Sequence, residues 1–423
     1  MVNKMINLKH APRGWNSWDC YGAAVDEETV RKNADYMAAN LKDSGYEYIT
    51  VDIQWYEPQA DTNEYHPFTE VCLDEYGRLI PAPNRFPSAA NGQGFKPLAD
   101  YVHSLGLKFG IHIMRGIPRQ AVHQNIPVLG TNVTARQIAK TASICAWNTD
   151  NYGVDPTKEG ARAYYDSIFA LYASWGVDFI KCDDICRELP HEEEEMIMLA
   201  DALHSCGRDM ILSLSPGPAL LEKAELYKQI ANMWRITDDF WDDWKLLYAM
   251  FERAEKWSIH AGNNHFPDAD MLPVGAIRQV YDVTNVTAFT QEEQITMMLL
   301  WCVMRAPLII GAEMTKNDKF TLDLLTNKGL MEMQEKSRHA HQVFRRNIGD
   351  NEVILWTAMK ADGGQYIVIF NADGPDGEIT IDLAELDFEG RIEASDIMTG
   401  EKVSFDGVIK ADVKAHCGVG FLI

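Results

Sequence analysis

The feature that most constrains this chain is the alternation of short apolar strands with helices through roughly its first three quarters. Parallel strands need a crossover between them, usually a helix, so this rhythm predicts a parallel sheet covered by helices. Eight such strands point to an α/β fold, a (β/α)₈ TIM barrel. We expect them at Gly14–Trp18, Tyr48–Asp52, Lys108–Ile113, Phe179–Asp183, Met210–Leu214, Met233–Thr237, Ser258–Ala261 and Pro307–Ile310.

The predicted helices carry terminal signals. Asp26 with Glu27 and Glu28 begins the first, and Gly45 follows its expected end at Ser44. Three further helices are expected to end close to a glycine. They are Phe95–Leu105, Lys158–Trp175 and Glu192–Ser205.

The character of the chain changes after Gln342. Alternating or β-branched runs separated by glycine-rich turns predict a C-terminal antiparallel β-sandwich domain. We divide the chain into a barrel, residues 1–340, and a β-domain, residues 341–423, with Lys336–Arg346 as a charged joint. The expected strands are Glu352–Thr357, Gln365–Asn371, Glu378–Asp382, Arg391–Asp396, Lys402–Phe405 and Gly418–Ile423.

Composition argues against some partners. The net charge is −23 with no basic stripe, so neither nucleic acid nor an anionic membrane is an expected partner. No apolar signal region or bilayer-spanning stretch is present. The eight cysteines are scattered without a Cys-x-x-Cys pair, so we expect reduced thiols in a cytoplasmic protein. The oligomeric state is open, and a homo-oligomer is one option.

Polar and aromatic residues end most of the predicted strands. Barrel enzymes build their sites at these strand ends. The candidates are Trp15, Trp18, Asp52, His112, Lys181, Asp183, Ser213, Ser215, Arg235 and Asp239.

The stretch Val177–Asp184 is the most informative of these strand ends. Lys181 and Asp183 are two residues apart, so on a strand they point to the same side. A neighbouring ammonium keeps a carboxylate ionised, which prepares it as a nucleophile. The alternatives are a solvated strand-end ion pair and a metal site at Asp183–Cys186, although no second His and Cys cluster accompanies it.

A second group of carboxylates lies among indole rings and a guanidinium in residues 233–244. Desolvation by aromatic rings raises the pKa of a carboxyl group. One ionised and one protonatable acid on a barrel rim suggest glycoside hydrolysis. Asp242 and Asp243 are better explained as a helix start, whereas spacing alone does not choose between Asp238 and Asp239.

Seven motifs follow one another along the barrel. They are Gly14–Trp18, Gly45–Asp52, Arg85–Pro87, Leu107–His112, Trp175–Asp183, Trp234–Arg235 with Asp239, and Pro267–Leu272. Together they resemble glycoside hydrolase family 27, the family of α-galactosidases and α-N-acetylgalactosaminidases. The resemblance implies a barrel followed by an antiparallel β-domain, and retaining hydrolysis of a sugar in the α-D-galacto configuration.

The resemblance also implies roles for single residues. The family's nucleophile lies in a Lys-x-Asp motif, here ending at Asp183, and its acid/base lies five residues after the Trp of the Trp-Arg motif, here Asp239. The implied substrate contacts are Trp15, Asp52, Lys181 and Arg235, with Trp18 and Trp55 as further rim or core candidates.

The sequence departs from the galactosidases at Ile53. Galactosidases carry two consecutive acids after the second strand, which hold O4 and O6 of the sugar, but here the pair is Asp52-Ile53. A buried hydroxyl without a partner costs about 1–3 kcal/mol. The pocket should therefore favour a sugar without the O6 hydroxyl, as β-L-arabinopyranose is, and the family's β-L-arabinopyranosidases resemble this sequence in having an apolar residue there. The alternative is that Ile53 is a core residue.

Two further departures concern the third and fifth strands. His112 replaces the family's common Tyr, and it is either a sugar contact or a core histidine bonded to a carbonyl. Ser213 and Ser215 occupy a loop that lacks the galactosidases' acid. This loop is similar to that of galactosaminidases, with room near O2.

We therefore predict a retaining exo-glycoside hydrolase acting on terminal galacto-configured pyranosides, with β-L-arabinopyranosidase preferred over α-galactosidase and α-N-acetylgalactosaminidase. Its partner is an oligosaccharide or glycoside, and no cofactor or metal is expected. Two alternatives from other classes are a metal-dependent hydrolase using His112, Asp52 and Asp183, and a non-catalytic sugar-binding protein. The β-domain should close one side of the barrel, although it could bind polysaccharide.

Overall fold

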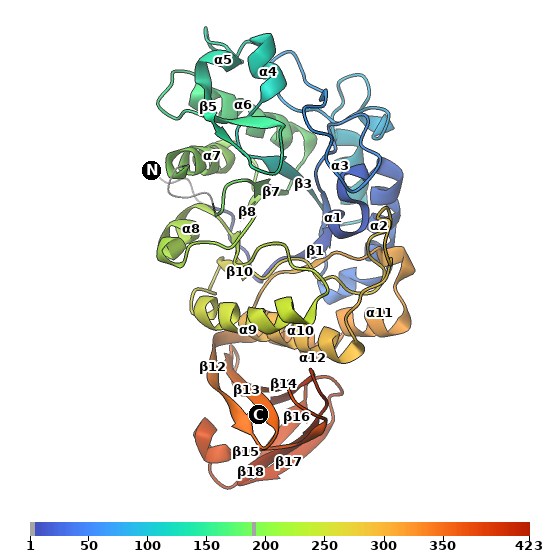
Figure 1. Cartoon of the computed structure of the whole chain (residues 1–423), viewed down its shortest axis with the longest axis vertical. Helices are drawn as coiled ribbons and strands as arrows, with labels where there is room; N and C mark the ends of the chain where they lie inside the picture. Colours follow the sequence, from blue (N-terminus) through green and yellow to red (C-terminus); the bar gives the residue numbers. More distant parts are fainter. Residues whose placement is uncertain (1–4, 188–191) are drawn as a thin grey trace.

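The computed structural model describes residues 5–187 and 192–423. Within these ranges eight parallel strands form a curled sheet that helices surround (Figure 1). The strand order is β10-β9-β8-β7-β3-β2-β1-β11, and a parallel bridge from Leu272 to Ile310 joins the two edges. The predicted barrel is confirmed. Its strands are β1 (Arg13–Asn16), β2 (Tyr48–Val51), β3 (Lys108–Met114), β7 (Phe179–Asp183), β8 (Ile211–Leu214), β9 (Met233–Arg235), β10 (Phe266–Asp268) and β11 (Leu308–Ile310).

The first predicted helix begins at its signal but ends earlier than expected. Asp26 caps α2 by accepting a hydrogen bond from the Thr29 amide. Helix α2 ends at Asn40 instead of Ser44, and a short 3-10 turn, Lys42–Ser44, leads to Gly45, whose φ is 86°. The helices are α1 (Trp18–Tyr21), α2 (Glu27–Asn40), α3 (Lys96–Ser104), α4 (Arg119–Gln124), α5 (Ala135–Ile138), α6 (Ala161–Trp175), α7 (Glu193–Ser205), α8 (Ala224–Ile230), α9 (Trp244–Ser258), α10 (Gln291–Met304), α11 (Lys319–Leu325) and α12 (Lys328–Lys336).

One predicted strand is wrong. Ser258–Ala261 lies at the end of α9, where the His260 and Ala261 amides still donate to carbonyls three residues earlier. Trp257 and Ser258 are buried as part of the helix, whereas Ile259 is exposed. The apolar run therefore belongs to a helix end, and the seventh barrel strand is Phe266–Asp268.

Side chains inside the barrel change from apolar to polar along the strands. Tyr48, Phe179, Ile211, Met233, Phe266 and Ile309 belong to one apolar cluster. Two residues further along β7, β8 and β9, on the same side of each strand, come Lys181, Ser213 and Arg235. Two residues beyond Lys181 comes Asp183. This period of two gives the barrel an apolar floor and a charged mouth.

The C-terminal antiparallel sandwich is also confirmed. Its sheet runs in the order β12-β13-β14-β19-β16-β17-β18-β15. The strands are β12 (Ser337–Ile348), β13 (Asn351–Lys360), β14 (Gln365–Asp373), β15 (Gly377–Asp382), β16 (Arg391–Asp396), β17 (Lys402–Asp406), β18 (Val408–Val413) and β19 (Gly418–Leu422).

Two of these strands were not predicted. The segment interpreted as a charged joint is the edge strand β12, whose Arg345 forms an ion pair with Glu352 of β13. Charged residues are common on edge strands, and here they mask the alternation of apolar and polar residues by which a strand is recognised in a sequence. The other is β18, which alternates buried Ile409, Ala411 and Val413 with exposed polar residues.

The β-domain packs against the barrel through α9, α10 and α12 (Figure 1). Both faces of β13 are buried, since Val353 and Leu355 enter the core of the sandwich while Ile354 and Trp356 join the apolar cluster of the barrel. The domain therefore covers the helical side of the barrel.

The chain leaves the barrel between β3 and β7 to form a small sheet. Its strands are β4 (Ile117–Pro118), β5 (Ala139–Ile144) and β6 (Asn151–Val154), in the order β4-β6-β5. Helices α4 and α5 accompany this sheet at one end of the molecule (Figure 1). This excursion supplies Arg119 and Trp147 to the cavities described below.

Two further observations concern the helices and the cysteines. None of the described helices combines the length and the apolar character needed to cross a bilayer. All eight cysteines are free, and most of them are buried.

Candidate active site

Asp183 lies at the C-terminal end of β7, and both of its carboxylate oxygens accept hydrogen bonds. His112 Nε2 lies 2.8 Å from Oδ2, and the Ser215 hydroxyl donates to Oδ1. These partners come from β3 and from the end of β8, the two strands beside β7 in the sheet. The barrel therefore fixes the orientation of this carboxylate from both sides.

The surroundings of Asp183 keep it ionised. Burial by itself would raise the pKa of this carboxyl, but the positive charge of Lys181 and the hydrogen bonds from His112 and Ser215 outweigh burial. The net result is a pKa far below the usual range. The side chain is accordingly a carboxylate at neutral pH.

Lys181 is held by a second buried carboxylate, Asp52. Its Nζ lies 2.9 Å from Asp52 Oδ2, and Asn16 Nδ2 donates to the same oxygen over 2.7 Å. Burial raises the pKa of Asp52, but the charges of Lys181 and His112 more than compensate, so the net pKa is lowered. The pair leaves neither buried charge without a counterion.

Asp239 follows β9 in a loop and lies in a different environment. Arg235 Nη2 is 2.6 Å from its Oδ1, and 59% of the Asp239 side chain is exposed. The expectation that indole rings enclose this acid is wrong. Trp234 is buried against Tyr227 and Trp257. Trp241 packs against the ring of Tyr281, so these indole rings contact other aromatic rings.

Arg235 is fixed from its other side by Asp270, whose Oδ1 lies 2.9 Å from Nη1. Burial raises the pKa of Asp270 to about 6, because it outweighs the attraction of Arg235. Asp270 belongs to the motif Pro267–Leu272, but residue spacing gave it no role. Asp270 thus positions Arg235, which forms the ion pair with Asp239.

The two acids open into one cavity of about 270 Å³. No residue of the β-domain lines it. Its lining residues are Trp18, Asp52, Tyr65, Trp147, Lys181, Asp183, Arg187, Pro216, Arg235, Asp238, Asp239 and Met271. A carboxylate, a lysine and a guanidinium thus surround the space between Asp183 and Asp239, as is suitable for holding several hydroxyl groups.

Five of the predicted substrate-binding residues lie behind the wall of this cavity. Trp15 is buried with its Nε1 donating to the Ala312 carbonyl, and Ile53 is 1% exposed in the apolar core. His112, Ser213 and Ser215 are buried, and the two serines line a smaller cavity beneath. His112 and Ser215 hold Asp183 by hydrogen bonds.

Residues that the sequence did not single out complete the cavity. Tyr65 stacks on Trp18 with ring centroids 5.4 Å apart, and the ring centroids of Tyr65 and Trp147 are 5.7 Å apart. Tyr65 and Trp147 are in long connecting segments without a periodic pattern, so neither strand position nor spacing marked them.

Asp184 is a structural residue beside the candidate nucleophile. Its carboxylate lies 2.7 Å from Arg115 Nη2, and Arg115 Nη1 lies 2.8 Å from Glu195. This buried ion network explains the second acid of the Asp183-Asp184 pair. Within residues 5–187 and 192–423, no three His, Cys, Asp or Glu side chains are arranged as a metal site.

The barrel, the sandwich and the paired acids define the class of protein, and comparison with known families agrees. A profile described as "Alpha galactosidase A" matches residues 13–155 and 156–336, and one described as "Alpha galactosidase C-terminal beta sandwich domain" matches residues 350–421. The chain belongs to glycoside hydrolase family 27, the α-galactosidase family.

Individual relatives refine the comparison. A β-L-arabinopyranosidase from Geobacillus stearothermophilus is 51% identical with a TM-score of 0.94, over 98% of this chain and 96% of that one. A structure described as a putative α-N-acetylgalactosaminidase from Bacillus halodurans is 48% identical with a TM-score of 0.87, over 100% and 99%. The α-galactosidase of Coffea arabica is 28% identical over 96% of this chain and 91% of its own length.

Proposed function

We propose that this protein is a retaining exo-glycosidase that removes terminal β-L-arabinopyranosyl residues from oligosaccharides or glycosides. The observation that carries the proposal is that no second acid follows Asp52: Ile53, which is buried behind the cavity wall, stands where galactosidases have the acid that holds O6. The Geobacillus enzyme supports it, since that β-L-arabinopyranosidase has also been crystallised with arabinose.

The proposed reaction has two steps. Asp183 attacks the anomeric carbon while Asp239 donates a proton to the leaving oxygen, which breaks the glycosidic bond and forms a glycosyl ester. Asp239 then removes a proton from water, which attacks the same carbon and releases Asp183. Two inversions leave the configuration retained, and a separation of ~5–5.5 Å between the two carboxyl groups is expected for this route.

The charged residues of the cavity support this chemistry. Asp52 can accept hydrogen bonds from sugar hydroxyls, and Lys181 and Arg235 can donate to them. Lys181 also keeps Asp183 ionised for attack. Buried His112 and Ser215 act through Asp183, which they hold in one orientation.

A comparison of rates tests the proposal. The protein is assayed with three nitrophenyl glycosides: β-L-arabinopyranoside, α-D-galactopyranoside and N-acetyl-α-D-galactosaminide. The extra hydroxyl of galactose would be buried without its partner, at about 1–3 kcal/mol, so kcat/KM should favour the arabinoside by roughly 5–150-fold. A higher kcat/KM with the α-D-galactopyranoside or with the N-acetyl-α-D-galactosaminide contradicts the proposal.

Ile53 itself is tested by two substitutions. Ile53→Asp restores the second acid and should narrow the preference for arabinoside over galactoside, whereas Ile53→Val keeps an apolar side chain and should retain it. Because Ile53 is buried, the melting temperature of both variants is measured alongside. An unchanged preference in folded Ile53→Asp assigns selectivity to another residue.

A further inference from the structure

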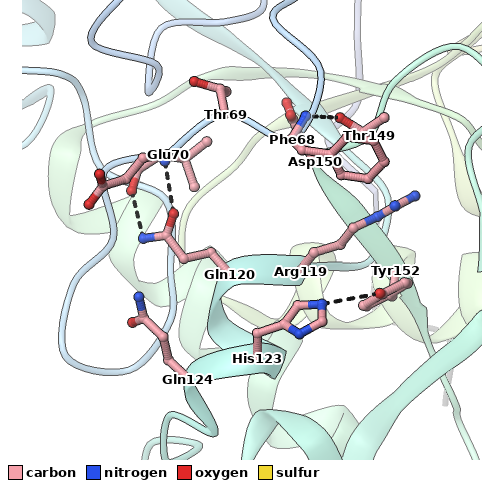
Figure 2. A pocket seen from close by; sticks show the side chains of 11 residues that line it. Phe68, Thr69, Glu70, Arg119, Gln120, His123, Gln124, Thr149, Asp150 and Tyr152 are labelled. Carbon is pink, nitrogen blue, oxygen red and sulfur yellow. Dashed lines mark hydrogen bonds between the residues drawn. The ribbon is translucent and has the colours of Figure 1, made fainter.

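A second concave site lies outside the catalytic cavity (Figure 2). It has a volume of about 340 Å³, within the range of small-molecule sites. Figure 2 shows Phe68 and Thr69 from the β2–α3 segment facing Arg119, Gln120 and His123 of α4 across the pocket. The pocket therefore lies between two segments that are far apart in the sequence.

Arg119 is oriented here without being neutralised. Its guanidinium carbon lies 5.5 Å from the centroid of the Phe68 ring and 4.8 Å from that of Tyr152, and Nε donates to the Asn151 carbonyl over 3.2 Å. Across the described residues, its two Nη groups have no hydrogen bond or carboxylate partner. A planar guanidinium with both Nη groups available matches a carboxylate.

Two carboxylates also line the pocket, and their positions leave this guanidinium available. Asp150 is buried, and its Oδ2 accepts hydrogen bonds from Tyr56 and from Gln54 over 2.6 and 2.8 Å. Glu70 is exposed and is not paired with Arg119.

Phe68 provides a second, independent observation. It is 75% exposed, and its φ of 56° is unfavourable for a bulky side chain. The Thr149 hydroxyl accepts a hydrogen bond from the Phe68 amide over 2.6 Å and holds this conformation. Strain that presents an apolar ring to solvent is a feature of binding sites, and such a ring offers a stacking face to a pyranose.

A third cavity of about 430 Å³ shares lining residues with both this pocket and the catalytic cavity. It shares Trp18, Tyr65 and Trp147 with the catalytic cavity, and it shares Thr149 with the pocket of Figure 2. Aromatic rings therefore lead from the catalytic acids towards Phe68 and Arg119. A chain of sugars leaving the catalytic cavity can follow this surface.

We propose that the pocket of Figure 2 is a distal subsite for a carboxylate-bearing sugar of the leaving group. Arg119 binds the carboxylate, and Phe68 stacks on the ring. The assignment of this sugar to the leaving group depends on the proposed glycosidase function, whereas its binding to the pocket does not.

Binding is measured first, by calorimetry on the full chain with glucuronate and with glucose. Glucuronate should bind more tightly than glucose, Arg119→Gln should weaken glucuronate at least about tenfold by loss of a charged pairing, and Phe68→Ala should weaken it less. Arg391→Gln, an exposed arginine of the β-domain, is the matched control and should change nothing. Equal binding of both sugars, or of neither, overturns the subsite.

Kinetics then test the link to catalysis. Arabinopyranosyl oligosaccharides that carry either glucuronate or glucose in the leaving group are compared. The unmodified protein should have the higher kcat/KM with the glucuronate substrate. In Arg119→Gln the ratio of kcat/KM for the glucuronate substrate to that for the glucose substrate should fall to about one. Glucuronate binding with an unchanged ratio overturns the leaving-group assignment. Failure to hydrolyse nitrophenyl β-L-arabinopyranoside counts against the proposed function alone, because the calorimetry still decides on the pocket.

Discussion

The two acids of the cavity are held in opposite ways. The Asp183 side chain is 11% exposed, and hydrogen bonds occupy both of its oxygens, whereas the Asp239 side chain is 59% exposed and Arg235 holds one of its oxygens. Asp183 comes from a barrel strand, and Asp239 comes from a loop. A nucleophile benefits from a fixed charge, while a group that exchanges protons needs access to water. The difference between the acids thus fits the roles that we propose for them.

The largest expected effect is at Asp183. Asp183→Ala removes the attacking carboxylate, and kcat should fall more than about 10³-fold, equivalent to about 4 kcal/mol of barrier. Single-turnover and steady-state assays with the nitrophenyl arabinoside measure this. An alanine variant with near-normal turnover would remove Asp183 from the mechanism.

Asp239 should show a smaller loss that depends on the leaving group. General acid catalysis contributes about 10²–10⁴-fold, and it matters most when the leaving oxygen is basic. Asp239→Ala should therefore lose more activity with an alkyl arabinoside than with a dinitrophenyl arabinoside. Asp238→Ala, its neighbour on the same loop, is the matched control. Equal losses with both substrates would reject Asp239 as the acid.

Ser215→Ala tests the supporting shell of Asp183. This hydrogen bond favours the carboxylate by about 1.5–3 kcal/mol, so its loss should raise the pKa of Asp183. Because the ionised form reacts, the acidic limb of the kcat/KM profile should move to higher pH. Ser213→Ala is the control, since Ser213 is buried nearby without a hydrogen bond to Asp183 among the described residues. Coincident profiles for Ser215→Ala and the unmodified protein would show that the hydroxyl does not tune this acid.

The smallest expected effect concerns stability in acid. Since folding lowers the pKa of Asp183, its ionisation stabilises the fold fully above an unfolded pKa of about 3.9, and this contribution is lost as pH falls towards the folded pKa. Asp183→Asn cannot titrate there, so its melting temperature should fall less steeply below pH ~4 than that of the unmodified protein. Asp239→Asn is measured in parallel. A slope unchanged by Asp183→Asn would show that other groups set the acid sensitivity.

Local pattern predicted the residues that lie on regular strands. The period of two along β7 placed Lys181 and Asp183 on one side, and apolar strand cores predicted seven of the eight barrel strands. Prediction failed where another element imitates the same pattern. The end of α9 looked like a strand, and the charges of β12 looked like a linker, because tertiary packing decides whether such a segment extends a helix or joins the edge of a sheet.

The sequence by itself determined the barrel, the sandwich and the place of Asp183 at the end of β7, because these depend on periodicity within single elements. The choice of Asp239 over Asp238 came from the family resemblance. Only the tertiary structure decided which side chains face the cavity. Trp15, Ile53 and His112 are buried and do not line the catalytic cavity. The tertiary structure also brought Tyr65 and Trp147 to the rim from separate loops. Loop side chains meet through long-range packing, which no local spacing encodes.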